Sequence, residues 1–169
     1  MSFFPQTLWD LLRPRRPRHQ RAKTATPVGA APRRRPMQER YDDLVAEMKK
    51  RYGIRVRKWR TSTSGCAWEV HYHDGTTTRL IEAPRPRGPV SCAIFLHEVG
   101  HHALGLRRFN PRCLEEYHAW AWSLRTMRER GFNVTPTVDK RMAESLRYAL
   151  AKARRRGLKR IPAELMPYA

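Results

Sequence analysis

The fold is decided by a stretch of sixteen residues, SCAIFLHEVGHHALGL, at positions 91–106. Apolar residues occupy most of these positions, which predicts a helix buried on most sides rather than one with a solvated face. His97 and His101 are four residues apart and share one face of such a helix, and Glu98 lies beside them. Buried imidazole and carboxylate groups are costly unless they are paired or bind a metal. The stretch therefore predicts a buried helix that carries a polar site.

The residues before this stretch predict one helix and a small sheet. Apolar side chains recur at helical spacing over residues 37–51, and Gly53 ends that pattern. Asp74-Gly75 is typical of a tight hairpin turn, and a proline-rich break follows at 84–89. Three strand-like segments are expected to pair in chain order as a three-stranded antiparallel meander: residues 54–60, 66–73 and 76–82.

The residues after it predict further helices. A turn at 107–111 is followed by a helical pattern over 112–130 that stops at Gly131. A second helical pattern covers 136–156 and ends at Gly157. The order of N-terminal helix, sheet, buried helix and two or three further helices predicts an α+β fold.

The charge of the chain is concentrated at its two ends. The chain has 35 Lys and Arg against 15 Asp and Glu, a formal net charge of +20. Residues 1–40 carry +8 and residues 132–169 carry +6, whereas the much longer middle segment also carries only +6. We expect nonspecific contact with nucleic acid through the basic N-terminal arm and the last helix.

Composition also predicts the division of the chain and its location. Proline and arginine dominate residues 1–36, which predicts a disordered arm before a domain over 37–157 and a tail over 158–169. No apolar stretch is long enough to span a membrane. The three cysteines form no CxxC pair, which makes a disulfide framework unexpected. A cytoplasmic location is expected, with mitochondrial targeting by the arginine-rich start as the alternative.

The two histidines need one more ligand to bind zinc. Two imidazoles and a third ligand leave one position for water, and a carboxylate beside them can take the proton of that water. If the helices before and after the 107–111 turn pack as an antiparallel hairpin, Glu115 and Glu116 come level with His101. Glu116 is favoured because it shares its helix face with the small Ala119, and Glu115 stays open as the alternative. The alternative for both is a solvated first-turn carboxylate.

The motif resembles that of a known family. HExxH at His97–His101 followed by Glu116-Tyr117-His118-Ala119 resembles the Glu-zincin metallopeptidases, in which ExxA lies on the next helix. The small ImmA/IrrE-type members are similar in the order of elements, and the resemblance covers about residues 40–130. It implies a zincin-like domain, Zn²⁺ held by His97, His101 and Glu116, and Glu98 as general base. Regulatory proteins, including repressors of phages and mobile elements, are the implied substrates. One departure is Trp120, where Asp or Asn usually follows the alanine.

The function expected from these residues is zinc-dependent hydrolysis of peptide bonds in a protein substrate. The developing oxyanion needs a further donor, for which Tyr117, His71 and His73 are candidates; the alternative for both strand histidines is simple solvation. Two other functions stay open. One is a non-catalytic basic nucleic-acid-binding module with a structural metal. The other is a DNA-associated protease that resembles the SprT type, which usually has a histidine as third ligand.

Overall fold

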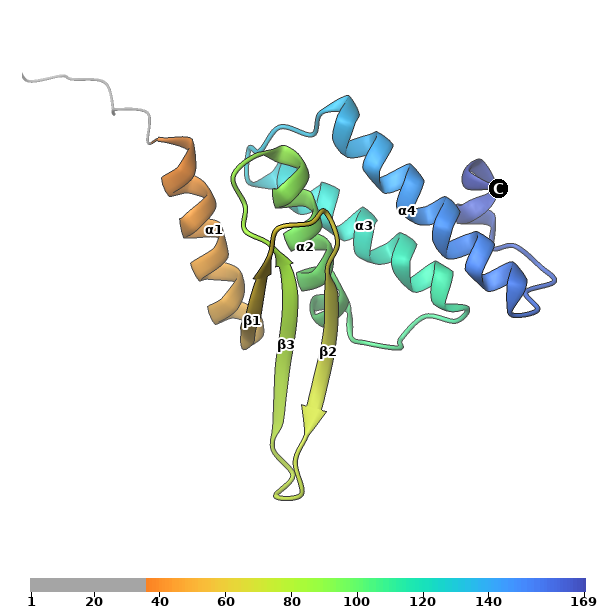
Figure 1. Ribbon diagram of the computed structural model, residues 1–169, viewed down its shortest axis with the longest axis horizontal. Coiled ribbons are helices and arrows are strands. Elements are labelled where there is room, and N and C mark those ends of the chain that lie inside the picture. The colour runs from red at the N-terminus through yellow and green to blue at the C-terminus, as the bar shows by residue number, and fades with distance from the viewer. Residues whose placement is uncertain (1–35) are drawn as a thin grey trace, which may run out of the picture. The chain divides into compact units, whose positions relative to one another are not determined.

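The structure, a computed structural model, describes residues 36–169, so the arm expected over residues 1–36 lies outside the described residues apart from Pro36. The α+β class is confirmed. The elements, shown in Figure 1, follow in the order α1 (Met37–Tyr52), β1 (Ile54–Arg60), β2 (Cys66–His71), β3 (Thr77–Pro84), α2 (Pro89–Leu104), α3 (Arg112–Glu129), α4 (Pro136–Arg155) and the short 3-10 helix η2 (Ala163–Tyr168).

The expectation of an antiparallel meander is wrong, because the three strands form a mixed sheet in the order β1-β3-β2. β2 and β3 pair antiparallel across the predicted hairpin turn, with His71 opposite Thr77. β1 pairs with β3 in parallel, from Ile54 opposite Arg79 to Arg60 opposite Pro84. β3 therefore lies between two strands that precede it in the chain.

The physical reason for this order is the burial of β3. Its second half is apolar, and Ile81 and Ala83 are fully buried against α2. Placing this strand at the centre of the sheet, with a neighbour on each side, removes more apolar surface from water than placing it at the edge of the sheet. The connection 61–65 must then cross two strand spacings, about 10 Å, which five residues with a reach of about 16 Å can span. This crossing loop ends at Gly65, which lies against Glu98 of α2.

Ion pairs tie β1 to the central strand. Glu82 on β3 is buried, and its two carboxylate oxygens contact Arg57 Nη1 at 3.1 Å and Arg60 at 3.0 Å. Arg60 also donates a hydrogen bond to Ser64 in the crossing loop at 3.1 Å. The same charged pairs thus fix the parallel strand and the start of the loop.

Helix α2 lies at the centre of the fold and is buried from Cys92 to His102. It packs against the sheet through β3 and against α3, its largest helix contact. The side chain of Ser91 fixes its start, since its hydroxyl accepts hydrogen bonds from the backbone N–H groups of Arg87 and Gly88. A helix of this composition is stable only when it is covered on all sides.

The remaining helices complete the cover. α1 is held through Tyr41, whose ring stacks on Phe132 with ring centroids 5.0 Å apart. α4 packs against α3, and η2 packs against both of them with Leu165 fully buried, within the segment expected as a tail over residues 158–169. Among the described residues, no helix combines the length and the hydropathy needed to cross a membrane.

Candidate metal centre

The three polar residues of the motif are buried side by side on α2. His97, Glu98 and His101 expose 5%, 5% and 4% of their surface. The rings of His97 and His101 lie one helical turn apart, with centroids at 4.7 Å. The helix therefore brings two imidazoles and a carboxylate to one buried place.

Helix α3 approaches α2 closely at this level. A Cβ atom added to Gly100 would lie 3.0 Å from the backbone oxygen of Ala119 and 3.1 Å from Trp122 Cε3. Glycine on one helix and alanine on the other permit this approach. The N-terminal part of α3, which carries Glu115 and Glu116, is thereby brought beside His101.

Glu116 completes a cluster of three possible ligands. Its Oε2 atom lies 3.2 Å from His97 Nε2 and 3.7 Å from His101 Nε2. The three ligand atoms lie within 4.8 Å of one another. Within residues 36–169, this is the one group of three or more His, Cys, Asp or Glu side chains with the spacing of a metal site. Two imidazole nitrogens and a carboxylate oxygen are ligands that zinc accepts.

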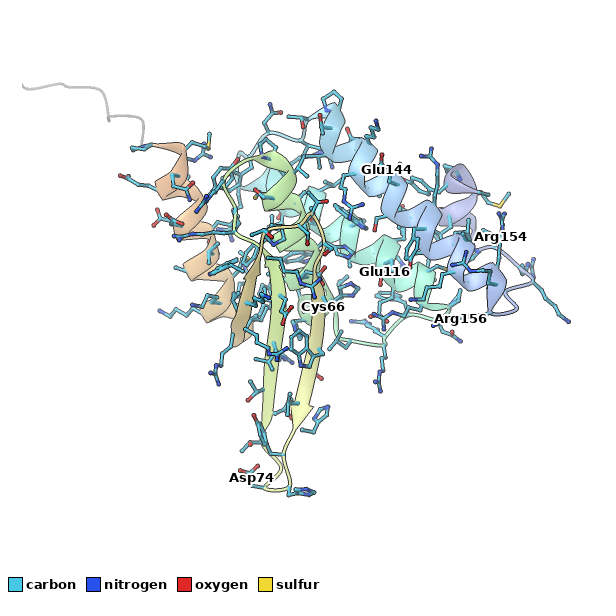
Figure 2. The ribbon with its side chains drawn as sticks, viewed as in Figure 1. Cys66, Asp74, Glu116, Glu144, Arg154 and Arg156 are labelled. Atoms are coloured by element: carbon cyan, nitrogen blue, oxygen red, sulfur yellow. The ribbon has the colours of Figure 1, made fainter. Side chains whose placement is uncertain are left out.

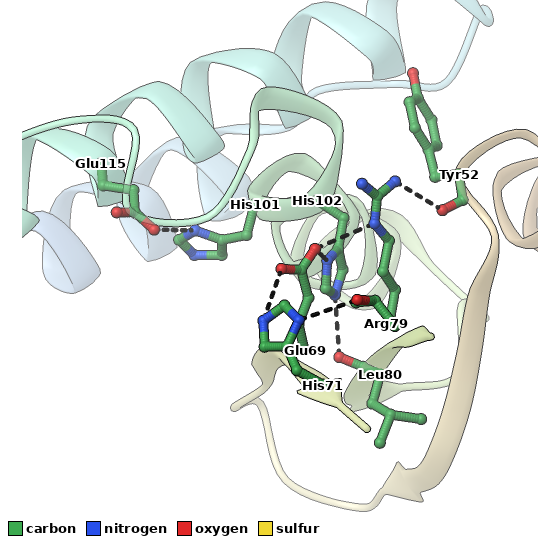
Figure 3. Close-up of polar contacts among 9 residues, drawn as sticks. Tyr52, Glu69, His71, Arg79, Leu80, His101, His102 and Glu115 are labelled. Atoms are coloured by element: carbon green, nitrogen blue, oxygen red, sulfur yellow. Dashed lines mark hydrogen bonds and ion pairs between the residues drawn. The ribbon is translucent and has the colours of Figure 1, made fainter. Parts of the chain in front are cut away.

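Glu115, left open by the sequence, lies behind the cluster rather than in it. Its Oε1 atom lies 3.3 Å from His101 Nδ1 (Figure 3), whereas Glu116 contacts the other ring nitrogen, Nε2. The carboxylate also accepts a hydrogen bond from the backbone of Arg107. This ion pair places a carboxylate beside Nδ1 of the imidazole and leaves Nε2 for a metal. The two neighbouring glutamates thus take different positions around one histidine.

The electrostatics of the cluster favour a positive charge at its centre. Burial opposes a charge on His101, but Glu115 and Glu116 outweigh burial and raise the pKa of His101 to about 9. Burial also opposes the charge on Glu116, yet the two imidazoles hold the pKa of Glu116 far below its usual range. His97 is different, since burial lowers its pKa despite the contact with Glu116. A bound cation could take the place of the proton on His101.

Glu98 is not one of the three clustered ligands, but it lines the same cleft as His97 and Glu116. Burial raises the pKa of Glu98 to about 8. Its carboxylate lies against Gly65, the last residue of the loop that crosses the sheet. A carboxyl group with a pKa near neutral can both take and give a proton, which suits a general base.

Trp120, which follows Ala119 on α3, packs directly against His97. Its ring stacks on His97 with centroids 4.6 Å apart and planes at 29°. His97 Nδ1 and Trp120 Nε1 are both buried, and neither has a hydrogen-bond partner among the described residues. The first histidine is therefore supported by an aromatic ring.

The cluster opens into a cleft of about 720 Å³ between the crossing loop, α2, α3 and α4. Thr63, Ser64 and Gly65 form one side, and α4 contributes Arg141 and the residues that follow it on the same face. Figure 2 shows Glu116 on α3 and Arg156 at the end of α4. Neither the loop nor Arg141 carries a local sequence signal for this site. The spacing of residues along α4 predicts which of them share a face, but it does not predict what that face contacts.

The three expected oxyanion donors lie elsewhere, since none of them is among the described residues that line the cleft. Tyr117 packs against the core and contacts the ring of His118. His71 is exposed near the end of β2 and contacts Thr77 Oγ1 at 3.0 Å, and His73 is exposed in the hairpin turn.

The other two histidines of this region also lie outside the cluster. His102 is buried against the sheet, where its Nε2 atom donates to the backbone oxygen of Leu80 at 3.1 Å (Figure 3). Its Nδ1 atom lies 4.0 Å from Glu69. His118 stacks on Phe109 with ring centroids 4.0 Å apart. Neither joins the group of ligand atoms around Glu116.

Comparison with known proteins adds no identity to this site. No family model, no curated protein and no solved structure matches the chain. Any function assigned to the chain therefore has to be argued from the residues and geometry of the site itself.

Proposed function

We propose that this chain is a zinc-dependent metallopeptidase that hydrolyses peptide bonds in a protein substrate. The observation that carries the proposal is the convergence of His97 Nε2, His101 Nε2 and Glu116 Oε2 beside a further buried carboxylate, Glu98, at an open cleft. The three ligands alone are compatible with either a structural or a catalytic metal site. Hydrolysis also requires a carboxylate beside the ligands to accept a proton from water, whereas a structural site does not.

The residues present fit a catalytic zinc ion. Catalytic zinc sites have three protein ligands and an open position, whereas structural sites are closed by four. Here three ligand atoms meet, and His97, Glu98 and Glu116 all line the cleft. The buried cluster also favours a positive charge, as the raised pKa of His101 shows. These features support an open catalytic site over a structural metal in a nucleic-acid-binding module.

The chemistry follows from the positions of the side chains. A zinc ion held by the three ligands would supply Lewis acidity, which polarises a carbonyl group and eases the deprotonation of water. Glu98 takes the proton from the attacking water and passes it to the leaving amine. Glu115 holds His101 in orientation, and the surrounding burial excludes bulk water from all sides except the cleft.

The resemblance of the motif to ImmA/IrrE-type Glu-zincins supports this class of activity and suggests a regulatory protein as substrate. A SprT-type site would require a histidine as third ligand, and His118 stacks on Phe109 instead. We place the enzyme in the cytoplasm, as its cysteine usage suggests; Cys66, Cys92 and Cys113 are free thiols in the structure.

The test measures metal content and cleavage on the same preparations. The full chain is purified as wild type, His97→Ala, Glu116→Ala and Glu98→Gln, and zinc is quantified by mass spectrometry. We expect about one zinc per chain in the wild type and in Glu98→Gln, and loss of zinc in the two ligand variants. Of these four proteins, only the wild type should cleave a mixed-sequence peptide library.

Glu144→Gln is the matched control, because Glu144 is an exposed carboxylate on α4 outside the cleft, and it should keep both zinc and cleavage. A purified wild type that contains no zinc would contradict the proposal. A zinc-loaded wild type that cleaves nothing in the library would favour the structural-metal function.

A further inference from the structure

One face of α4 forms a positively charged wall of the cleft. Arg141, Ser145, Ala149, Lys152 and Arg156 all line the cleft. They are spaced four, four, three and four residues apart, so they share one side of the helix and its last turn. Three of the five are cations, and α4 contributes no acidic side chain to this wall.

These cations are available to a ligand. Arg141 donates through Nη2 to the backbone oxygen of Thr63 at 2.8 Å, while its Nε atom is buried and has no hydrogen-bond partner among the described residues. Lys152 and Arg156 are exposed, and within residues 36–169 no ion pair involves either of them. Arg112 on α3 differs, since it lies 3.6 Å from Glu116. An unpaired buried donor is costly unless a ligand satisfies it.

The spacing of the charges fits an extended chain. Arg141 and Lys152 are eleven residues apart, which corresponds to about 16 Å along a helix axis. An extended peptide covers this distance with about five residues. Arg141 lines the same cleft as His97 and Glu98, so a peptide along this wall would pass the metal cluster.

We infer that the cleft selects an extended peptide segment with acidic side chains, which Arg141, Lys152 and Arg156 bind along α4. The inference rests on the proposed function for its reaction and names the substrate class of that same site. Arg141 has the most defined role, because its contact with Thr63 holds the guanidinium in place. Because Arg141 lines the cleft, its guanidinium can donate hydrogen bonds to a carboxylate of the substrate.

A peptide fits this wall better than a nucleic acid. Single-stranded nucleic acid is bound on a series of aromatic platforms as well as by cations. Of the aromatic rings among the described cleft residues, Trp120 is buried under His97 and only Tyr148 is exposed. The wall between the cations carries small side chains such as Ala149 and Ala153, which leave room for a peptide backbone.

The test measures binding to the full-length, zinc-loaded Glu98→Gln protein, so that no cleavage interferes. The probes are labelled decapeptides with blocked ends, one with Asp and Glu at alternate positions and one with Asn and Gln instead. A third has neutral side chains and a free C-terminal carboxylate, and the fourth is a single-stranded oligonucleotide. Fluorescence anisotropy at low and high salt gives the affinities. We expect the acidic peptide to bind at least about tenfold more tightly than the other two peptides at low salt.

Charge-removing variants locate the binding site. We expect Arg141→Gln, and separately Lys152→Gln with Arg156→Gln, to reduce the preference for the acidic peptide by about fivefold or more. The matched control is Arg147→Gln with Arg154→Gln, which removes two exposed cations from α4 outside the cleft. If Arg141→Gln does not fold, the double variant alone decides the outcome.

Three outcomes would overturn the inference: equal binding of acidic and neutral peptides, an equal effect of the control variant, or tighter oligonucleotide binding that the cleft variants abolish. Each of these outcomes can occur while the wild type still cleaves neutral peptides, in which case the proposed function stands. Conversely, the wild type could cleave no peptide while Glu98→Gln still binds the acidic peptide selectively. That result would support the binding site and contradict the proposed peptidase activity.

Discussion

Gly65 lies in direct contact with the side chain of Glu98. A Cβ atom added at Gly65 would come within 2.6 Å of Glu98 Cγ and 2.7 Å of its Cδ, and it would overlap the carboxylate oxygen Oε1. No side chain larger than hydrogen fits at position 65 while Glu98 keeps its place. The loop that crosses the mixed sheet therefore determines where the proposed general base lies.

The first prediction concerns Gly65→Ala. The added methyl group should displace the carboxylate of Glu98 without touching the three ligands, so zinc content should stay at the wild-type level. Displacement of a reacting group by about 1 Å lowers the rate about 100-fold. We therefore expect kcat of peptide hydrolysis to fall by about this factor, measured with zinc quantified in the same sample.

Gly88→Ala is the control for this variant, because a Cβ atom at Gly88 meets nothing within 4 Å. It should leave both kcat and zinc content unchanged. A Gly65→Ala protein with wild-type kcat would show that Glu98 is not positioned by this loop.

The second prediction concerns Glu115→Gln. Glu115 contacts His101 Nδ1 at 3.3 Å and is buried, so its charge orients the imidazole and increases the basicity of Nε2. The amide should weaken zinc binding by about 10- to 100-fold, as measured by competition with a chelator. Glu116→Gln, which replaces a ligand, should weaken binding further.

Glu69→Gln is the control, because Glu69 also contacts a histidine, His102 at 4.0 Å, but this histidine is not one of the proposed ligands. Its zinc affinity should equal that of the wild type. Unchanged zinc affinity in Glu115→Gln would mean that the orientation of His101 depends on other contacts.

Local patterns in the sequence were sufficient for the elements but not for the order of the strands. Helical periodicity and the Asp74-Gly75 turn predicted α1, α2 and the β2–β3 hairpin, because these depend on neighbours in the chain. Strand order depends on which strand packs best against α2, a contact between distant residues. The pairing of β1 was therefore predicted wrongly.

The site shows the same division between local and long-range information. The four-residue spacing places His97 and His101 together on any helix. The different positions of Glu115 and Glu116 depend on how closely α3 approaches α2, which the sequence pattern does not determine. Arg141 reaches the cleft only because α4 packs beside α3, so no local motif could have identified it.

The third prediction concerns this helix approach and the variant Gly100→Ala. Replacing glycine by alanine inside a helix normally stabilises it by about 0.5–1 kcal/mol. At Gly100 the methyl group would lie 3.0 Å from the backbone oxygen of Ala119, which cannot move without moving α3. We expect the free energy of unfolding to fall by about 1–3 kcal/mol, measured by urea denaturation of the metal-free protein. An increase in stability would contradict the close packing of α2 on α3.

The fourth prediction concerns pH and the pair of Glu47 on α1 with Arg130 after α3. The hydrogen bonds from Arg130 hold the pKa of Glu47 below its usual range. A carboxyl group whose pKa is lower in the folded than in the unfolded state stabilises the fold above its unfolded pKa. This contribution disappears as the pH falls through the folded pKa. The pair is partly exposed, so its contribution at neutral pH should be about 0.5–1 kcal/mol.

Glu47→Gln should therefore lower the free energy of unfolding by this amount at pH 7, and the difference from wild type should shrink as the pH is lowered from 7 to about 3. The measurement is urea denaturation over this pH range with the metal-free protein. Glu144→Gln removes an exposed carboxylate on α4 and should follow the wild type throughout. A difference for Glu47→Gln that does not shrink as the pH falls would assign the effect to altered packing of α1 rather than to the charge of Glu47.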